Sequence, residues 1–105
     1  MINKESELRK LKQFKSLKYN WNDYNGLPIN KKAIRTAKRL VKLLYPTPFV
    51  SPIGRGTIQL EWKTKNGYLE FEICENEISI YNQDKFENII IDAQMDKFSK
   101  NEVII

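Results

Sequence analysis

The stretch Thr57-Ile-Gln-Leu-Glu-Trp-Lys-Thr-Lys-Asn-Gly-Tyr-Leu-Glu-Phe-Glu-Ile73 decides the fold of this chain. Apolar and polar side chains alternate along it, which is typical of β-strands with one buried and one solvated face. The Asn66-Gly67 dipeptide in its middle is the strongest short signal for a hairpin turn. The sequence therefore predicts two antiparallel strands joined at this dipeptide.

A two-residue turn at Asn66-Gly67 also predicts the register of the hairpin. The residues that would then lie opposite each other are Trp62 with Phe71, Leu60 with Ile73, Lys63 with Glu70, and Glu61 with Glu72. A second turn at Glu75-Asn76 would pair Ile73 with Ile78 and add a third strand. The segment from Phe86 to Ile91 is short and rich in β-branched residues, and it predicts a fourth strand, with a helix as the weaker alternative.

Two helices are predicted ahead of this sheet. Asn3 is a suitable N-cap for the first, whose apolar residues recur every three or four positions until turn formers begin near Tyr19. Asn30 caps the second helix, which must end before Pro46 because proline cannot continue a helix. The apolar stripe of the second helix consists of Ala33, Ile34, Ala37, Leu40, Val41 and Leu44.

These elements predict an α+β fold, with two N-terminal helices packed on one face of a three- or four-stranded antiparallel β-meander. A chain of 105 residues has room for a single domain with a core of its own. We expect a helical half at about 3–45, a proline-rich connector at 46–56, a sheet half at 57–92 and an unassigned tail at 93–105.

The composition indicates which classes of protein this chain does not belong to. With 41% hydrophobic and 30% charged residues, it is expected to be neither disordered nor membrane-spanning. The single cysteine suits a reducing cytoplasm, and the absence of histidine removes the commonest general base and metal ligand. We therefore expect a cytoplasmic protein that is not an enzyme and that uses no cofactor and no metal.

The net charge of +5 is divided unevenly along the chain. Residues 1–55 carry 13 basic and 3 acidic side chains, a balance of +10, whereas residues 56–105 carry 5 basic and 10 acidic ones, a balance of −5. Such an asymmetry between the two halves of a chain points to interactions with partners. It predicts a basic helical side and an acidic sheet side.

The segments Asn20-Trp-Asn-Asp-Tyr-Asn-Gly-Leu-Pro-Ile-Asn30 and Gly56-Thr-Ile-Gln-Leu-Glu-Trp62 resemble two motifs of a widespread family of small, uncharacterised bacterial proteins. The family pattern runs Asn-Trp-Asp-Gly-Tyr-Gly-Ala-x-Pro-Ile-Ser and, after a proline-rich connector, Gly-x-Ile-Gln-Leu-Glu-Trp. This chain departs from it at Asn22-Asp23 and Asn25-Gly26. The resemblance spans residues 8–81 and implies a shared fold rather than an activity; phage and mobile elements are the genomic setting that we expect for it.

The acidic sheet face is the first candidate for partner binding. It carries Glu61, Glu70 and Glu72, with Tyr81 beside them, and we expect it to bind a basic protein surface. A solvated sheet face is the simpler interpretation. The carboxylates would also suit Mg²⁺ or Ca²⁺, but no aspartate-rich loop accompanies them, so we expect no metal.

The aromatic turn and the second helix are the other candidates. Trp21 and Tyr24 could anchor a partner if they are exposed, whereas packing of Trp21 into the core is the alternative. The polar side of the second helix could contact a phosphate backbone, with a solvated lysine-rich face as the simpler interpretation. The residues of this candidate nucleic-acid surface are Lys31, Arg35, Lys38, Arg39 and Lys42.

The sequence thus predicts a non-enzymatic protein-binding module of the inhibitor, antitoxin or immunity type, with self-association through opposite charges as a related prediction. A nucleic-acid-binding accessory protein that uses the basic helix is the alternative. Glu61-Trp62-Lys63 imitates the Glu-x-Lys step of a metal-dependent nuclease. That chemistry also needs an upstream aspartate, and the only aspartate before residue 61 is Asp23, in a predicted turn.

Overall fold

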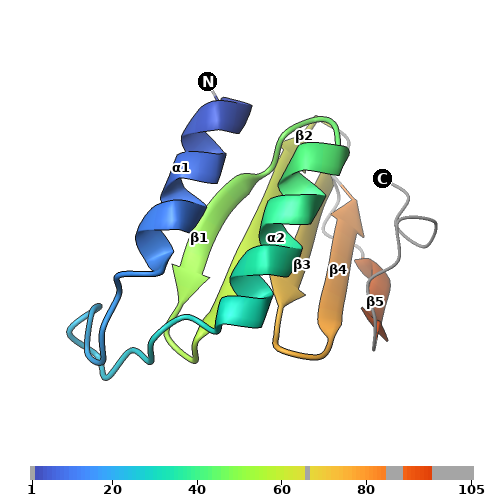
Figure 1. Ribbon diagram of the computed structural model, residues 1–105. Helices are drawn as coiled ribbons and strands as arrows, with labels where there is room; N and C mark the ends of the chain where they lie inside the picture. Colours follow the sequence, from blue (N-terminus) through green and yellow to red (C-terminus); the bar gives the residue numbers. More distant parts are fainter. Residues whose placement is uncertain (1, 66, 85–88, 96–105) are drawn as a thin grey trace.

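The computed structural model describes residues 2–65, 67–84 and 89–95. Its elements in chain order are α1 (Lys4–Phe14), α2 (Lys31–Leu43), β1 (Phe49–Ile53), β2 (Thr57–Thr64), β3 (Gly67–Ile73), β4 (Ile78–Asp84) and β5 (Ile89–Met95). The strands form one antiparallel sheet in the order β1-β2-β3-β4-β5, and both helices lie side by side on one face of it (Figure 1). The predicted α+β class, with N-terminal helices on an antiparallel sheet, is confirmed.

Both predicted N-caps are present. The side-chain oxygens of Asn3 and Asn30 each accept the backbone N–H of the residue three positions further on, at 3.1 and 3.0 Å. α1 ends at Phe14, earlier than the predicted end near Tyr19. The N–H groups of residues 15–17 bond to carbonyls three positions back, which tightens the last turn and stops the helix.

The core lies between the helices and the sheet, because α1 packs on α2 and β1 while α2 packs on β2 and β3. Trp62 and Phe71 meet edge to face with ring centroids 5.0 Å apart, and Trp62 Nε1 donates to the Pro46 carbonyl at 2.6 Å. Both helices and the first three strands contribute fully buried side chains to this core: Leu11, Ala33, Ala37, Leu40, Val41, Val50, Ile58, Leu60 and Ile73.

The proline-rich segment at 46–56, which we expected to be a connector, contains β1. Pro48 precedes this strand and Pro52 lies within it. β1 is at the edge of the sheet, where a residue without an N–H is tolerated on the unpaired side. The sheet therefore has five strands rather than three or four. The additional strand, β1, was not predicted because proline is usually excluded from strands.

The register of the β2–β3 hairpin differs from the predicted one. Thr64 pairs with Gly67, so residues 65 and 66 connect the strands and Gly67 belongs to β3. A Cβ at Gly67 would lie 2.1 Å from the Gln83 carbonyl oxygen, and its φ of +152° also favours glycine. The four predicted pairs are wrong by two residues, a shift that keeps every side chain on its predicted face because strands repeat with period two. The observed pairs include Ile58 with Ile73, Leu60 with Phe71, Glu61 with Glu70, Trp62 with Leu69, and Lys63 with Tyr68.

The later part of the meander agrees with the second predicted turn. Ile73 pairs with Ile78, and Phe71 with Ile80, as a turn at Glu75-Asn76 requires. A further strand follows as β5, although residues 86–88 of the predicted fourth strand lie outside the described residues. The part of the predicted tail from residue 96 onward lies outside them as well.

Candidate interaction surfaces

Exposed cations cover the outer side of both helices, three on α1 and six on α2. We call them the basic helix surface: Lys4, Arg9, Lys12, Lys31, Lys32, Arg35, Lys38, Arg39 and Lys42. On these two helices, every residue of which is described, the only exposed carboxylate is that of Glu5, because Glu7 is 3% exposed. All five predicted residues of the second helix thus lie on this surface, and α1 extends it.

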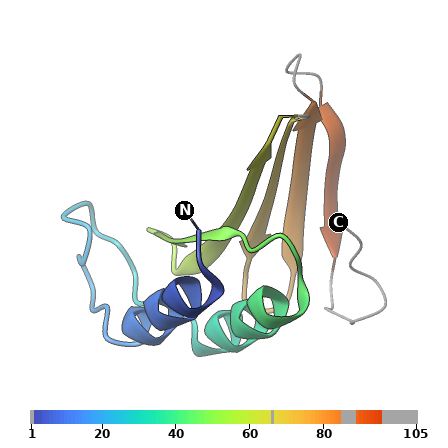
Figure 2. The same cartoon turned by 90° about the horizontal axis from the view of Figure 1, so that it is seen from above.

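The packing of the helices produces this arrangement. The apolar stripe of α2 is turned to the sheet, so its cations must lie on the opposite side, and the two helices lie next to each other in one layer (Figure 2). Two of the lysines also form hydrogen bonds to other elements. Lys4 Nζ donates to the Lys42 carbonyl at 3.2 Å, and Lys32 Nζ donates to Asn76 Oδ1 at 2.9 Å.

The other face of the sheet is covered by neither helix (Figure 2). Four residues lie opposite one another across β1, β2, β3 and β4, and we call them the open-face row: Phe49, Glu61, Glu70 and Tyr81. The structure therefore brings together three of the four residues predicted for the acidic face. Glu72 lies two residues further along β3, opposite Gln59 and Ser79, and Glu61 faces Glu70 rather than Glu72.

Tyr68 joins the two opposed carboxylates. Its hydroxyl lies 3.0 Å from Glu61 Oε2 and 2.6 Å from Glu70 Oε1, and Gln59 Nε2 donates to Glu61 Oε2 at 3.1 Å. Burial raises the pKa of Tyr68 far above its ordinary value, and the hydrogen bonds to both carboxylates raise it further. A phenol has a single hydrogen and can donate it to only one of the carboxylates at a time, so the pair keeps excess negative charge.

A separate ion pair neutralises Glu72. Arg55 Nε and Nη2 donate to its two carboxylate oxygens at 2.6 and 2.5 Å, and Thr57 Oγ1 donates at 2.7 Å. The hydrogen bond from Arg55 is the main reason why the pKa of Glu72 lies below its ordinary value, and it raises the pKa of Arg55. Glu72 is therefore already satisfied within the chain and is a poor candidate for binding a partner.

The structure separates the two residues predicted for the aromatic turn. Trp21 is half-buried against the core, and its Nε1 donates to the Leu27 carbonyl at 2.7 Å. Tyr24 is 85% exposed. Trp21 thus has the packing role that was the alternative prediction, and Tyr24 alone is placed as an anchor would be.

The turn that carries Tyr24 is held by its asparagines. Asn22 Oδ1 accepts the backbone N–H groups of Tyr24 and Gly26 at 2.9 and 2.8 Å, while Asn20 and Asn25 adopt positive φ, which asparagine tolerates. Gly26 is required by close approach, since a Cβ there would lie 2.9 Å from Trp21 Cε2. The turn is therefore a preformed structure, and the motif residues build it.

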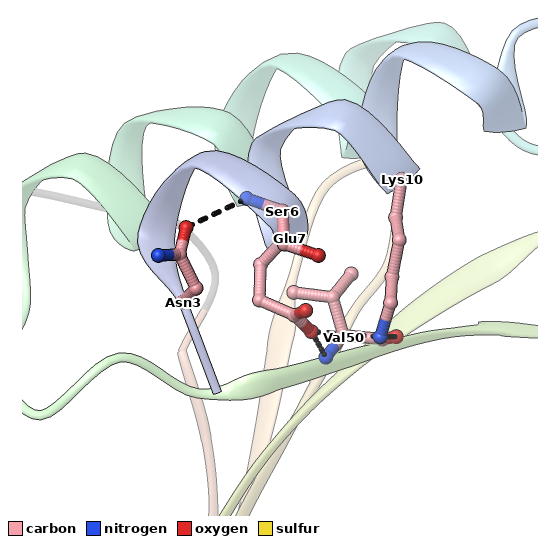
Figure 3. A network of polar contacts seen from close by, with 5 residues as sticks. All are labelled: Asn3, Ser6, Glu7, Lys10 and Val50. Carbon is pink, nitrogen blue, oxygen red and sulfur yellow. Dashed lines mark hydrogen bonds and ion pairs between the residues drawn. The ribbon is translucent and has the colours of Figure 1, made fainter. Parts of the chain in front are cut away.

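A further polar group, which the sequence analysis did not identify as a site, joins α1 to the edge of the sheet (Figure 3). Glu7 Oε1 accepts the Val50 N–H at 2.8 Å, and Lys10 Nζ lies 2.8 Å from the same oxygen and 3.4 Å from the Val50 carbonyl. Lys10 also lies 3.8 Å from the centroid of the Phe49 ring. The backbone groups that an edge strand would offer to another strand are thus occupied at Val50.

Glu7, Tyr68 and Arg55 make contacts that were not predicted from the sequence, and only some of them leave a local sequence signal. Glu7 lies on the same helical stripe as Leu11 and Phe14, so a carboxylate within an apolar stripe was the available signal. Tyr68 follows the hairpin turn on the polar face, but its role depends on the register that the sequence misassigned. Arg55 pairs with a residue 17 positions away, which no local pattern reveals.

Metal and membrane chemistry find no support among the residues that the structure describes. No group of three or more His, Cys, Asp or Glu side chains there is placed to hold a metal ion. The pKa of Cys74 is raised, mainly by burial, which disfavours the reactive thiolate. No described helix is long and apolar enough to span a bilayer.

Comparison with protein-family models, curated proteins and solved structures finds no match to this chain. The geometry of its own surfaces is therefore the basis for assigning a function.

Proposed function

We propose that this chain is a non-enzymatic binding protein that docks a basic surface of a partner protein on the open face of its sheet. The observation that carries the proposal is the opposition of Glu61 and Glu70 on neighbouring strands with one hydroxyl hydrogen between them. Like charges directly opposite each other cost stability unless a cation offsets them. Lys63 Nζ is 3.7 Å from Glu61 Oε1, but its side chain is 76% exposed and offsets little.

The neighbours of these carboxylates fit a lysine or arginine side chain of a partner. Phe49 and Tyr81 stand at the two ends of the open-face row, which spans about 14 Å at the usual strand spacing. The Phe49 ring already carries Lys10 of this chain, so Tyr81 is the ring that a partner's cation would contact. Aromatic rings beside carboxylates hold a cation through both its charge and its contact with the ring face. Tyr68 packs edge to face on Tyr81 at 6.3 Å and keeps this set in place.

A protein of this kind acts by covering a basic site on its partner, which is the mode of an inhibitor, antitoxin or immunity protein. The basic helix surface of a second copy has the same chemistry as such a site. Self-association at low salt is therefore a related expectation. Sedimentation as a monomer at high concentration and low salt would contradict self-association.

The test compares two charge-matched double variants as baits in pull-down from native lysate. Glu61→Gln with Glu70→Gln removes the opposed charges but keeps oxygens that accept the Tyr68 hydrogen bond. Glu75→Gln with Glu77→Gln makes the same change of charge in the β3–β4 turn. We expect a partner that binds the wild type and the turn variant and is lost from the open-face variant.

Recovery of the same proteins by all three baits would contradict the proposal, as would repeated recovery of none. The circular dichroism spectra of both variants must match that of the wild type. A loss of binding can then be attributed to the removed charges and not to unfolding.

A further inference from the structure

The basic helix surface is chemically unlike the open-face row and calls for a different ligand. It places nine exposed cations on two adjacent helices against one exposed carboxylate, that of Glu5. From Lys31 to Lys42 it extends about 16 Å along α2 at 1.5 Å per residue. Like charges spaced three and four residues apart on a helix repel each other, so counter-charge from outside would stabilise them.

We infer that this surface binds the phosphate backbone of double-stranded nucleic acid without reading its sequence. A duplex carries one negative charge per about 1.7 Å of its axis, so a stretch as long as α2 presents about ten phosphates. Several cations on one face are what the release of condensed counterions requires. The inference is independent of the proposed docking on the open face, because the two surfaces lie on opposite sides of the helix and sheet layers (Figure 2).

Neither α1 nor α2 exposes an aromatic side chain, which favours a duplex over a single strand; the exposed Tyr45 lies two residues beyond the end of α2. Within α1 and α2 the only aromatic residue is Phe14, and it is buried. Proteins that bind single strands stack the bases on exposed aromatic rings, whereas contacts to phosphate alone suit a duplex. Lysine and arginine on a helix face with no groove-reading motif predict binding that is independent of sequence.

The surface is also held in a fixed shape. Lys4 donates to the carbonyl of Lys42 at the C-terminal end of α2, so the two helices are bridged at that end. Lys32 donates to Asn76 at 2.9 Å, so the other end of α2 is tied to the β3–β4 turn. A rigid pair of helices presents its cations together and loses less conformational freedom on binding.

The experiment measures the affinity of the full chain for a fluorescent DNA duplex of about 20 base pairs as a function of salt. We expect binding at low salt whose logarithm falls linearly with the logarithm of salt concentration. Lys38→Gln with Lys42→Gln should weaken it at least about tenfold at low salt and reduce the magnitude of the slope by about 2. Lys63→Gln with Lys65→Gln, which makes the same charge change on the sheet, should alter it by less than about twofold.

Several results would overturn the inference. Equal losses in the two double variants would show that net charge rather than this surface attracts DNA. Tighter binding of a single strand than of the duplex, or binding to phosphatidylserine vesicles without binding to the duplex, would assign the surface to another ligand. If the chain binds no duplex at low salt, the surface is not a nucleic-acid site. A clear preference for one of two unrelated duplex sequences would contradict binding that is independent of sequence.

Discussion

The open face of the sheet and the outer side of the helices are both exposed and charged, but their charges are in different states. On the sheet, Arg55 pairs with Glu72, and Tyr68 lies between Glu61 and Glu70. On the helices, nine exposed cations share one exposed carboxylate. The comparison shows that the two surfaces call for different ligands, a cationic side chain on the sheet and an anionic backbone on the helices.

The two surfaces differ because of their geometry. Neighbouring strands bring side chains from distant parts of the sequence within about 5 Å of each other. Acidic and basic side chains on a sheet can therefore form ion pairs. A helix brings together residues three and four positions apart, and every charged residue of α2 is basic. Glu72 is thereby neutralised within the chain, whereas the cations of α2 have no carboxylate on their own helix.

The largest effect on stability is expected at Glu7, the helical carboxylate that is buried and paired. Glu7→Ala should lower the free energy of unfolding by about 2–3 kcal/mol, because it leaves the Val50 N–H and the Lys10 ammonium without their buried acceptor. Urea unfolding measures the change. Glu5→Ala, an exposed position two residues away on the same helix, should change stability by no more than about 0.5 kcal/mol. Equal changes in the free energy of unfolding for the two substitutions would show that the buried contacts of Glu7 do not stabilise the fold.

A smaller loss is expected on the sheet. Tyr68→Phe should lower the free energy of unfolding by about 1–2 kcal/mol, because Glu61 and Glu70 lose the hydrogen that lies between them. The loss should shrink at high salt, which screens the repulsion between the two carboxylates. Tyr81→Phe, which keeps the ring packed on Tyr68, serves as the control. A loss that does not change with salt concentration would mean that the hydroxyl matters for packing rather than for charge.

The Arg55–Glu72 pair predicts a further pH dependence. The folded-state pKa of Glu72 is below its unfolded value, so the pair contributes stability that is present above the unfolded pKa and lost as the pH falls through the folded one. Arg55→Met should cost about 1 kcal/mol at neutral pH, and its stability should converge with that of the wild type in acid. Chemical unfolding across pH measures this. A constant difference at every pH would exclude the ion pair as its cause.

The smallest effect should have the opposite sign. Lys31→Gln should raise stability by about 0.5 kcal/mol at low salt, because the cation lies four residues from Arg35 and at the positive end of the α2 dipole. The gain should fade at high salt, where exposed charges are screened. Loss of stability at low salt would mean that Lys31 has a counter-charge after all, and the contrast between the two surfaces would weaken.

Much of the fold was predictable because periodicity is a local property. The alternation from Thr57 to Ile73 and the N-caps at Asn3 and Asn30 predict the sheet, its faces and the two helix starts. β1 was missed because its prolines are acceptable only at a sheet edge, and edge position is not local information. The register was missed by two residues because such a shift leaves every side chain on the same face.

The candidate surfaces divide in the same way. Helical geometry alone places residues 31–42, so the basic side of α2 follows from the amino-acid sequence. Three features instead depend on how the elements pack: α1 extends this surface, Glu61 faces Glu70 across Tyr68, and Glu7 occupies the edge of β1. These contacts join residues from different elements. Their geometry depends on strand register and helix packing, which the one-dimensional pattern leaves open.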